Sequence, residues 1–352
     1  MSAGIPPPAE PAAAPIAKGQ VATGRVRRAR VFRVVQLFVS ATLLTFVFRR
    51  IDLTLVGDVL DRVHWKLWTF GLALALLAPL AAACRFAAML GADGYHVRTR
   101  SVLAVNLEAM FFSLVLPGDL VGGAIRWARV GQHTGRRGGA LGLVICERLL
   151  DWAALGICAA AGAGLLFAGP DAERSRSVVL LGGGMLAAAA IGSLAISASD
   201  AWPRVAEWAE AAVHGRVATW LIRSVGSVLG GLHGVMTSRA LMLRAIGYTA
   251  LYWLLALTGA VAMAHAVHAE LPPLPFIAAM SAIAVVAQLP LTIGGLGLRE
   301  ASLPFLLAAY GVTREVGLVI GLSAFVPGLL LGLAGAGIHM GGLSRLVAAD
   351  PT

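Results

Sequence analysis

The segment LWTFGLALALLAPLAAACRFAAML, residues 67–90, decides the fold class. As a helix, an apolar run of about 20 residues or more is long enough to cross the hydrocarbon core of a bilayer. Similar apolar runs occur at 31–48, 141–167, 178–196, 241–266 and 316–338. Together they predict an all-α protein, a polytopic integral membrane bundle with about six full spans.

The composition of the whole chain agrees with this prediction. Of the 352 residues, 58% are hydrophobic and 13% are charged, whereas about 25% are charged in soluble domains. The mean hydropathy is +0.81. These values exclude a disordered protein and a secreted disulfide scaffold, and they argue against a soluble enzyme.

Two sets of residues with metal-binding side chains are interpreted without a metal. The cysteines lie apart inside apolar segments, where we expect small buried side chains rather than disulfides or ligands; they are Cys84, Cys146 and Cys158. His265, His268 and Glu270 end an apolar run next to two prolines, which predicts an interfacial turn. The sequence therefore predicts no metal and no cofactor.

The distribution of basic residues predicts the orientation in the membrane. The net charge is +10, and an arginine cluster at 25–33 directly precedes the first apolar run. Because Lys and Arg are retained on the cytoplasmic side, we interpret the charge as an orientation signal and not as nucleic-acid binding. The sequence then divides into a disordered cytoplasmic tail (1–30), a membrane domain (31–345) and a short tail (346–352), with both termini cytoplasmic. Basic loops are expected on that side at 98–100, 126–137 and 204–244, although basic residues at 49–66 fall on the outside.

Four further segments have patterns that do not fit a full span. Residues 51–65 and 202–237 alternate apolar and charged residues with the period of a helix that lies on the membrane surface. The apolar segments 102–116 and 276–310 are short or interrupted by proline. We expect each of these two to be a re-entrant broken-helix element, the first entering from the inside and the second from the outside.

The two breaks resemble each other. They read LPGDLVGGAIR (116–126) and LPLTIGGLGLR (289–299), and in both an arginine follows the proline by nine residues. The likeness is either a coincidence in a chain rich in Gly and Leu, or an internal repeat of opposite topology. Repeats of that kind place broken helices across a substrate site near the middle of the bilayer.

The breaks have the chemistry of an anion site. Freed backbone N–H groups need partners in the membrane, glycines let an anion approach them, and an arginine binds a phosphate with two donors. No P-loop or dinucleotide motif is present, so nucleotide hydrolysis has no support in the sequence. The candidate lipid- and phosphate-binding residues are Pro117, Gly118, Gly122, Gly123, Arg126, Gly294, Gly295, Gly297, Arg299 and Asn106.

Charged residues inside apolar runs form a second candidate set. Each costs about 2.5–3.5 kcal/mol at the middle of the membrane, so each needs a partner or a function. Glu147 and Asp151 share a helix face; one can neutralise Arg148, and the other can reach an arginine at a break. The alternative is an ion pair that only joins helices. Arg85 has no acid in its own segment, so it either extends to the membrane interface or points into a cavity.

Three polar residues flank the breaks. Glu300 follows Arg299 and is expected to cap a helix that begins at Ala301, where a negative charge is favourable. Asn106 and Glu108 precede the first break. They either form hydrogen bonds between helices or contribute to a ligand site.

The segments LPGDLVGGAIRWARV (116–130), ERLLD (147–151) and IGGLGLREASL (293–303) resemble the signatures of the lysylphosphatidylglycerol synthase transmembrane, or flippase-like, family. The resemblance covers residues 31–345. One departure is Ala124, where many members have an acid. The family pattern falls on Pro117, Gly118, Gly122, Arg126, Glu147, Arg148, Asp151, Gly294, Gly295, Gly297, Arg299 and Glu300.

The resemblance implies a domain of the bacterial inner membrane that moves a lipid with an anionic head group between leaflets. Residues 339–352 are too few for the soluble aminoacyl-transfer domain of the full synthases, so we expect no lysyl-lipid synthesis by this chain. Two alternatives stay open. One is a non-transporting, lipid-binding accessory subunit of a separate lipid or glycolipid synthase. The other is a membrane transferase acting on a lipid phosphate, with Glu147 or Asp151 as base.

Overall fold

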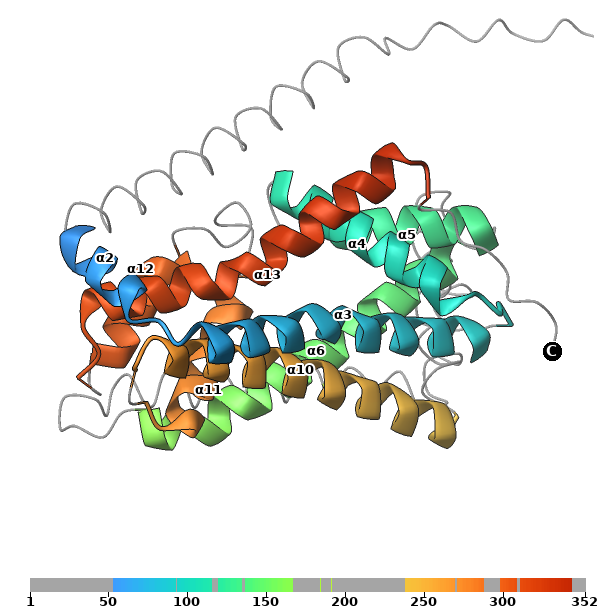
Figure 1. The fold of residues 1–352 in the computed structure, drawn as a ribbon. Coiled ribbons are helices and arrows are strands. Elements are labelled where there is room, and N and C mark those ends of the chain that lie inside the picture. Colours follow the sequence, from blue (N-terminus) through green and yellow to red (C-terminus); the bar gives the residue numbers. More distant parts are fainter. Residues whose placement is uncertain are drawn as a thin grey trace, which may run out of the picture.

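The described part of the chain is a bundle of α-helices (Figure 1). The computed structural model describes residues 53–92, 94–115, 120–134, 137–166, 184, 191, 238–269, 271–287, 298–308 and 311–343. Its helices are α2 (Leu53–Asp61), α3 (Trp65–Ala92), α4 (Thr99–Val115), α5 (Leu120–Thr134), α6 (Arg137–Leu166), α10 (Arg239–Ala266), α11 (Pro273–Ala287), α12 (Leu298–Leu307) and α13 (Arg314–Met340).

Three helices are long and apolar enough to cross a membrane within the described residues, namely α3, α10 and α13. They occupy the predicted spans 67–90, 241–266 and 316–338. The 30-residue helix α6 covers the predicted span at 141–167. Helix α2 confirms that the predicted amphipathic segment 51–65 contains a helix. Outside the described residues lie the predicted tails, the spans at 31–48 and, except for positions 184 and 191, 178–196, and the amphipathic segment 202–237.

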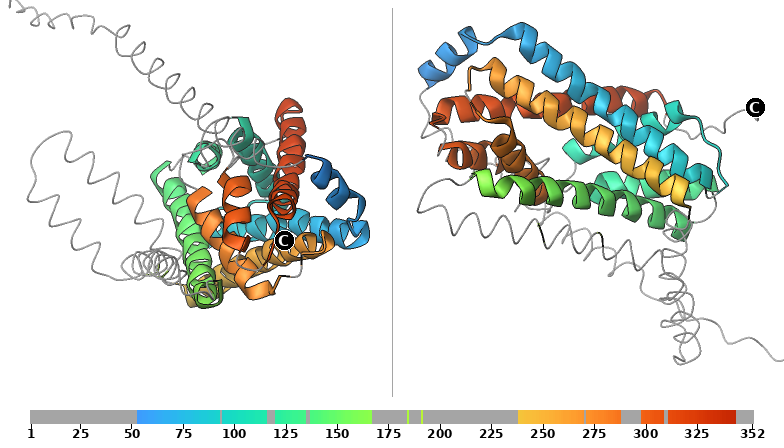
Figure 2. Two further views of the ribbon diagram at one scale, coloured as in Figure 1. Left: turned by 90° about the vertical axis from the view of Figure 1, so that its left-hand side faces the viewer. Right: turned by 90° about the horizontal axis from the view of Figure 1, so that it is seen from below.

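Helices α3 and α10 lie side by side along the long axis of the bundle (Figure 2). Gly71 of α3 and Gly259 of α10 face each other so closely that a Cβ atom on either would lie 2.6 Å from the other's carbonyl oxygen. Small residues at a crossing allow this approach, which membrane helices need because lipid does not drive them together. Ser238 and Thr313 cap the N-termini of α10 and α13 by accepting hydrogen bonds from backbone N–H groups.

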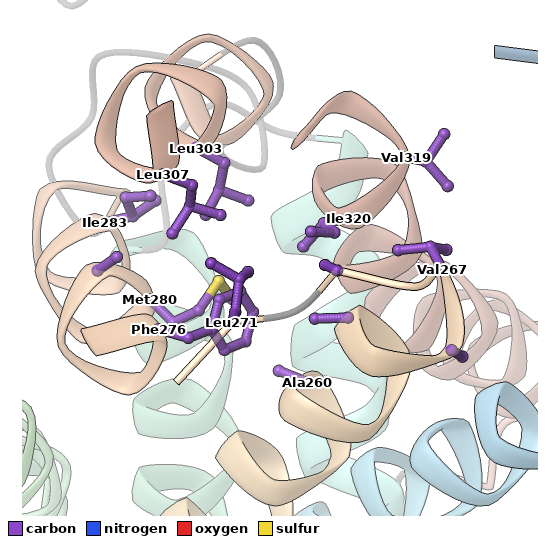
Figure 3. Packing of buried hydrophobic residues seen from close by; sticks show 14 of the residues in the cluster. Ala260, Val267, Leu271, Phe276, Met280, Ile283, Leu303, Leu307, Val319 and Ile320 are labelled. Carbon is purple, nitrogen blue, oxygen red and sulfur yellow. The ribbon is translucent and has the colours of Figure 1, made fainter. Parts of the chain in front are cut away.

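The buried apolar residues form two clusters near opposite ends of the long helices. One joins α4 and α5 to the C-terminal half of α3 and the N-terminal parts of α6 and α10. The other joins α11 and α12 to the C-terminal end of α10 and the N-terminal half of α13 (Figure 3). The two pairs of short helices, which contain the predicted re-entrant segments, therefore lie at opposite ends of the bundle (Figure 1).

The prediction of a basic loop at 126–137 is wrong for most of that segment. Arg126 and Arg129 lie on helix α5, and only residues 135–136 between α5 and α6 are outside the description. The physical reason is that Val130 and Trp127 pack into the apolar cluster while both arginines have carboxylate partners on neighbouring helices. The many arginines of this segment predicted a loop because their carboxylate partners, which allow a helix to pack here, are distant in the sequence.

The predicted turn after the span 241–266 is confirmed. His268 follows the end of α10 with a positive φ of 57°. One of its ring nitrogens, Nε2, lies 2.8 Å from the carbonyl oxygen of Arg62, and the backbone N–H of His64 donates to the carbonyl oxygen of Ala266 at 2.8 Å. The three cysteines are free, and Cys146 is buried as expected.

Candidate functional site: a charged cavity among α3, α4, α5, α6 and α10

Five of the predicted charged residues, Arg85, Arg126, Glu147, Arg148 and Asp151, meet at a cavity of about 190 Å³ that is partly open to the outside of the bundle. Five helices contribute to its wall, and the first break and the ERLLD segment are both represented. The lining residues are Pro79, Ala82, Arg85, Asn106, Ala109, Met110, Ser113, Gly122, Arg126, Glu147, Arg148, Asp151 and Tyr252. The structure thus brings together residues as distant in the sequence as Pro79 and Tyr252.

Arg85 lies at the centre of the ion-pair network. It is 1% exposed, so the alternative in which it extends to the membrane interface is wrong. Its guanidinium donates to Glu147 Oε1 at 2.8 Å and to Asp151 Oδ1 at 2.9 Å. A third hydrogen bond goes to Thr249 Oγ1 at 2.6 Å, which ties α3 to α10 as well as to α6. A buried arginine needs such partners because it stays charged.

Arg126 shares one of these acids. Its guanidinium contacts Glu147 Oε2, so the two oxygens of Glu147 bind two different arginines. The predicted pairing of an ERLLD carboxylate with Arg126 is confirmed. Asp151 has another partner on α10, because Trp253 donates to its Oδ1 at 3.2 Å. Arg148 lines the same cavity.

Several buried polar atoms of the cavity-lining residues have no hydrogen-bond partner. Among the described residues, the buried side-chain atoms without a partner are Arg85 Nε, Arg126 Nε, Asn106 Oδ1 and Ser281 Oγ, and the first three belong to cavity-lining residues. Asn106 is only 7% exposed. An unsatisfied buried polar group costs about 1–3 kcal/mol. A ligand that carries both acceptors and a donor would satisfy these atoms.

Gly122 has a packing role in addition to its place in the cavity wall. A Cβ atom there would lie 2.6 Å from Ser113 Oγ and 3.2 Å from the carbonyl oxygen of Ala109, so glycine allows α5 to pack directly on α4. Gly122 and Gly123 also lie in the first turn of α5, whose backbone N–H groups have no partner within the helix. The N-terminal turn of α5 therefore points partial positive charge toward the region of the cavity.

Glu108 belongs to a separate contact outside the cavity. Arg129 donates to both of its oxygens, at 2.6 and 3.0 Å, and His339 Nδ1 of α13 lies 2.7 Å from Oε1. The expectation that Glu108 bonds to other helices is confirmed. The ring of His339 also packs edge-on against Phe112, with ring centroids 5.0 Å apart.

The second break is only partly covered by the structure. Helix α12 begins at Leu298, three residues before the predicted start at Ala301, so Glu300 lies inside the first helical turn rather than before it. A carboxylate there is still favoured by the helix dipole. The structure does not describe the side chains of Arg299 and Glu300, nor the candidate residues Gly294, Gly295 and Gly297 of this break. Pro117 and Gly118 of the first break also lie outside the described residues.

Two hydroxyl-bearing residues of α10 at the site were not predicted from the sequence, and neither was Trp253, which donates to Asp151. Thr249 and Tyr252 are polar residues within the apolar run of α10, and both face the charged residues of α3 and α6. Their signal in the sequence was the hydroxyl group inside a membrane span, which is favourable when it can bond to another helix.

Comparison with known families gives one match. The model of the family described as lysylphosphatidylglycerol synthase TM region matches residues 33–335. The chain belongs to this family. No curated protein and no solved structure gives a significant match to it. The matched residues include those that line the cavity and both breaks.

Proposed function

We propose that this member of the lysylphosphatidylglycerol synthase transmembrane family moves a lipid with an anionic head group between the leaflets of a membrane, without nucleotide hydrolysis. The observation that carries the proposal is Arg126. It lies on a short helix at the wall of a partly open cavity, and its Nε has no partner while its Nη1 binds Glu147, the carboxylate that Arg85 also binds. A phosphate can bind such a guanidinium with two hydrogen bonds.

The network allows an anion to enter and leave. Arg85 keeps Asp151 as a partner when Glu147 shifts toward Arg126 or away from it. A phosphate that approaches the first turn of α5 competes with Glu147 for Arg126, so binding exchanges one negative partner for another. A site of this kind binds without trapping its ligand, which a transporter requires.

The positions of the short helices support alternating exposure. The pair α4 and α5 packs at one end of the long helices, and α11 with α12 packs at the other. The cavity is lined by α4 and α5 but not by α11 or α12, so in this proposal the second pair acts by moving against the first, as opposed broken-helix elements do in transporters that expose a ligand to one side at a time. In this proposal the protein lies in the bacterial inner membrane with both termini cytoplasmic, and it has no catalytic centre of its own.

Lipid exchange in proteoliposomes tests the proposal. Vesicles are prepared with an acyl-labelled fluorescent anionic phospholipid, and dithionite quenching reports the fraction that reaches the outer leaflet. We expect exchange above empty vesicles, and we expect Arg126→Lys to slow it because the two-donor geometry is lost while the charge remains. Arg129→Lys is the matched control, since Arg129 is on the same helix but pairs with Glu108 outside the cavity.

The outcomes separate the competing functions. Exchange no faster than in empty vesicles would refute transport. If labelled lipid still bound to the purified protein in that case, the accessory role beside a separate lipid or glycolipid synthase would replace it. Equal slowing by Arg126→Lys and Arg129→Lys would show that general damage to α5, and not the cavity arginine, limits exchange.

A further inference from the structure

The partnerless atoms at the cavity are of two opposite kinds. Arg85 Nε and Arg126 Nε are hydrogen-bond donors, whereas Asn106 Oδ1 is an acceptor. Phosphate oxygens can satisfy the two guanidinium donors. They cannot satisfy the amide oxygen of Asn106, because a phosphodiester has no hydrogen to donate. A ligand that pairs all three atoms must therefore carry a donor next to its phosphate.

We propose that Asn106 selects lipids whose phosphodiester head group carries a hydroxyl donor, as in a polyol or sugar head group, over lipids of equal charge without one. This inference rests on the proposed function and specifies its substrate class. Asn106 lies on α4, is almost fully buried, and lines the same cavity wall as Ser113, about two turns further along the same face of the helix. It is a specificity residue, since it binds the head group beside the phosphate.

The charges of the cavity favour a hydroxyl over an ammonium group as the donor. Both carboxylates that line the cavity, Glu147 and Asp151, already bind Arg85, and Glu147 also binds Arg126. An ammonium beside Asn106 would add a further cation near these arginines, and like charges in a poorly hydrated site repel strongly. A neutral hydroxyl supplies the same hydrogen without that repulsion.

The size of the cavity fits a compact head group. Its volume of about 190 Å³ is many times the roughly 10–15 Å³ that holds a single water molecule. This is room for a phosphate with a small polar substituent, while the acyl chains stay outside in the partly open direction. The cavity wall then contacts both ends of the head group at once.

A comparison of three lipids on the wild-type protein tests the proposal directly. Phosphatidylglycerol and phosphatidylmethanol carry the same single charge and differ in the hydroxyls, and phosphatidylethanolamine offers an ammonium donor. Dissociation constants are measured on protein in nanodiscs of phosphatidylcholine doped with each lipid. We expect phosphatidylglycerol to bind up to about tenfold more tightly than phosphatidylmethanol, the range of one hydrogen bond, and phosphatidylethanolamine to bind more weakly than both.

Variants assign the preference to Asn106. Asn106→Leu should bind phosphatidylglycerol as weakly as phosphatidylmethanol. Ser281→Ala is the control, because Ser281 is also buried with a partnerless oxygen but lies on α11 outside the cavity lining; it should keep the preference. If Asn106→Leu does not fold, Asn106→Ala takes its place, and it should likewise bind phosphatidylglycerol as weakly as phosphatidylmethanol.

The lipid comparison distinguishes failure of this inference from failure of the proposed function. Equal affinity of wild-type protein for phosphatidylglycerol and phosphatidylmethanol, with both above phosphatidylcholine, overturns the role of Asn106 and leaves the anionic site intact. Tighter binding of phosphatidylethanolamine than of phosphatidylglycerol overturns the choice of hydroxyl over ammonium. Affinity for both anionic lipids no greater than for phosphatidylcholine overturns the proposed function together with this inference.

Discussion

Replacing Glu147 with glutamine removes one charge from the centre of the network and keeps the shape of the side chain. Arg85 retains Asp151, but Arg126 loses its carboxylate. Removing one partner of a buried ion pair costs about 3–5 kcal/mol. The side chain of Arg126 is 13% exposed, so it recovers some hydration, and we expect Glu147→Gln to lower the free energy of unfolding by about 3 kcal/mol, the lower end of that range.

The double variant and an added lipid reveal the origin of this loss. Arg126→Gln in the Glu147→Gln background removes the uncompensated cation, so the double variant should be more stable than the sum of the two single losses. An anionic lipid should stabilise Glu147→Gln more than the wild type, because its phosphate no longer competes with a carboxylate for Arg126. Both quantities come from SDS titrations in mixed micelles, with and without phosphatidylglycerol.

The control is Glu108→Gln, which breaks the buried pair with Arg129 outside the cavity. It should also lose stability, but phosphatidylglycerol should not restore it. Strictly additive losses for Arg126 and Glu147 would show that the two residues are not coupled. Equal stabilisation of the wild type and Glu147→Gln by lipid would refute the competition between carboxylate and phosphate.

Two further predictions concern the helices that position the site. Gly259→Ala places a Cβ 2.6 Å from a carbonyl oxygen of α3 and should cost about 1–3 kcal/mol of unfolding free energy, whereas Gly247→Ala, with nothing within 4 Å, should cost almost none. Cysteines placed at Asp119 and Thr292 should be labelled by impermeant maleimide from opposite sides of sealed vesicles, as the opposed topology predicted from the sequence requires; labelling of both from one side would contradict that topology.

The sequence by itself determined the helical membrane class and the position of the long helices. An apolar run longer than about 20 residues has few other stable structures in a bilayer, so α3, α6, α10 and α13 fall where the pattern predicted them. The pairing of Arg126 with an acid of the 147–151 segment could also be predicted, because a charge inside an apolar run requires an opposite charge and the sequence offers few candidates.

Only the tertiary structure decided which faces of those helices meet. Arg85 contacts Glu147 and Asp151 at sequence separations of 62 and 66 residues, and Thr249 at 164. Nothing local marks Asn106 as the residue whose oxygen stays without a partner beside them. Periodicity fixes which residues share one helix face, but in a membrane almost every face is apolar. The rotation of each helix is therefore set by close contacts such as that of Gly71 with Gly259, and by the ion pairs themselves.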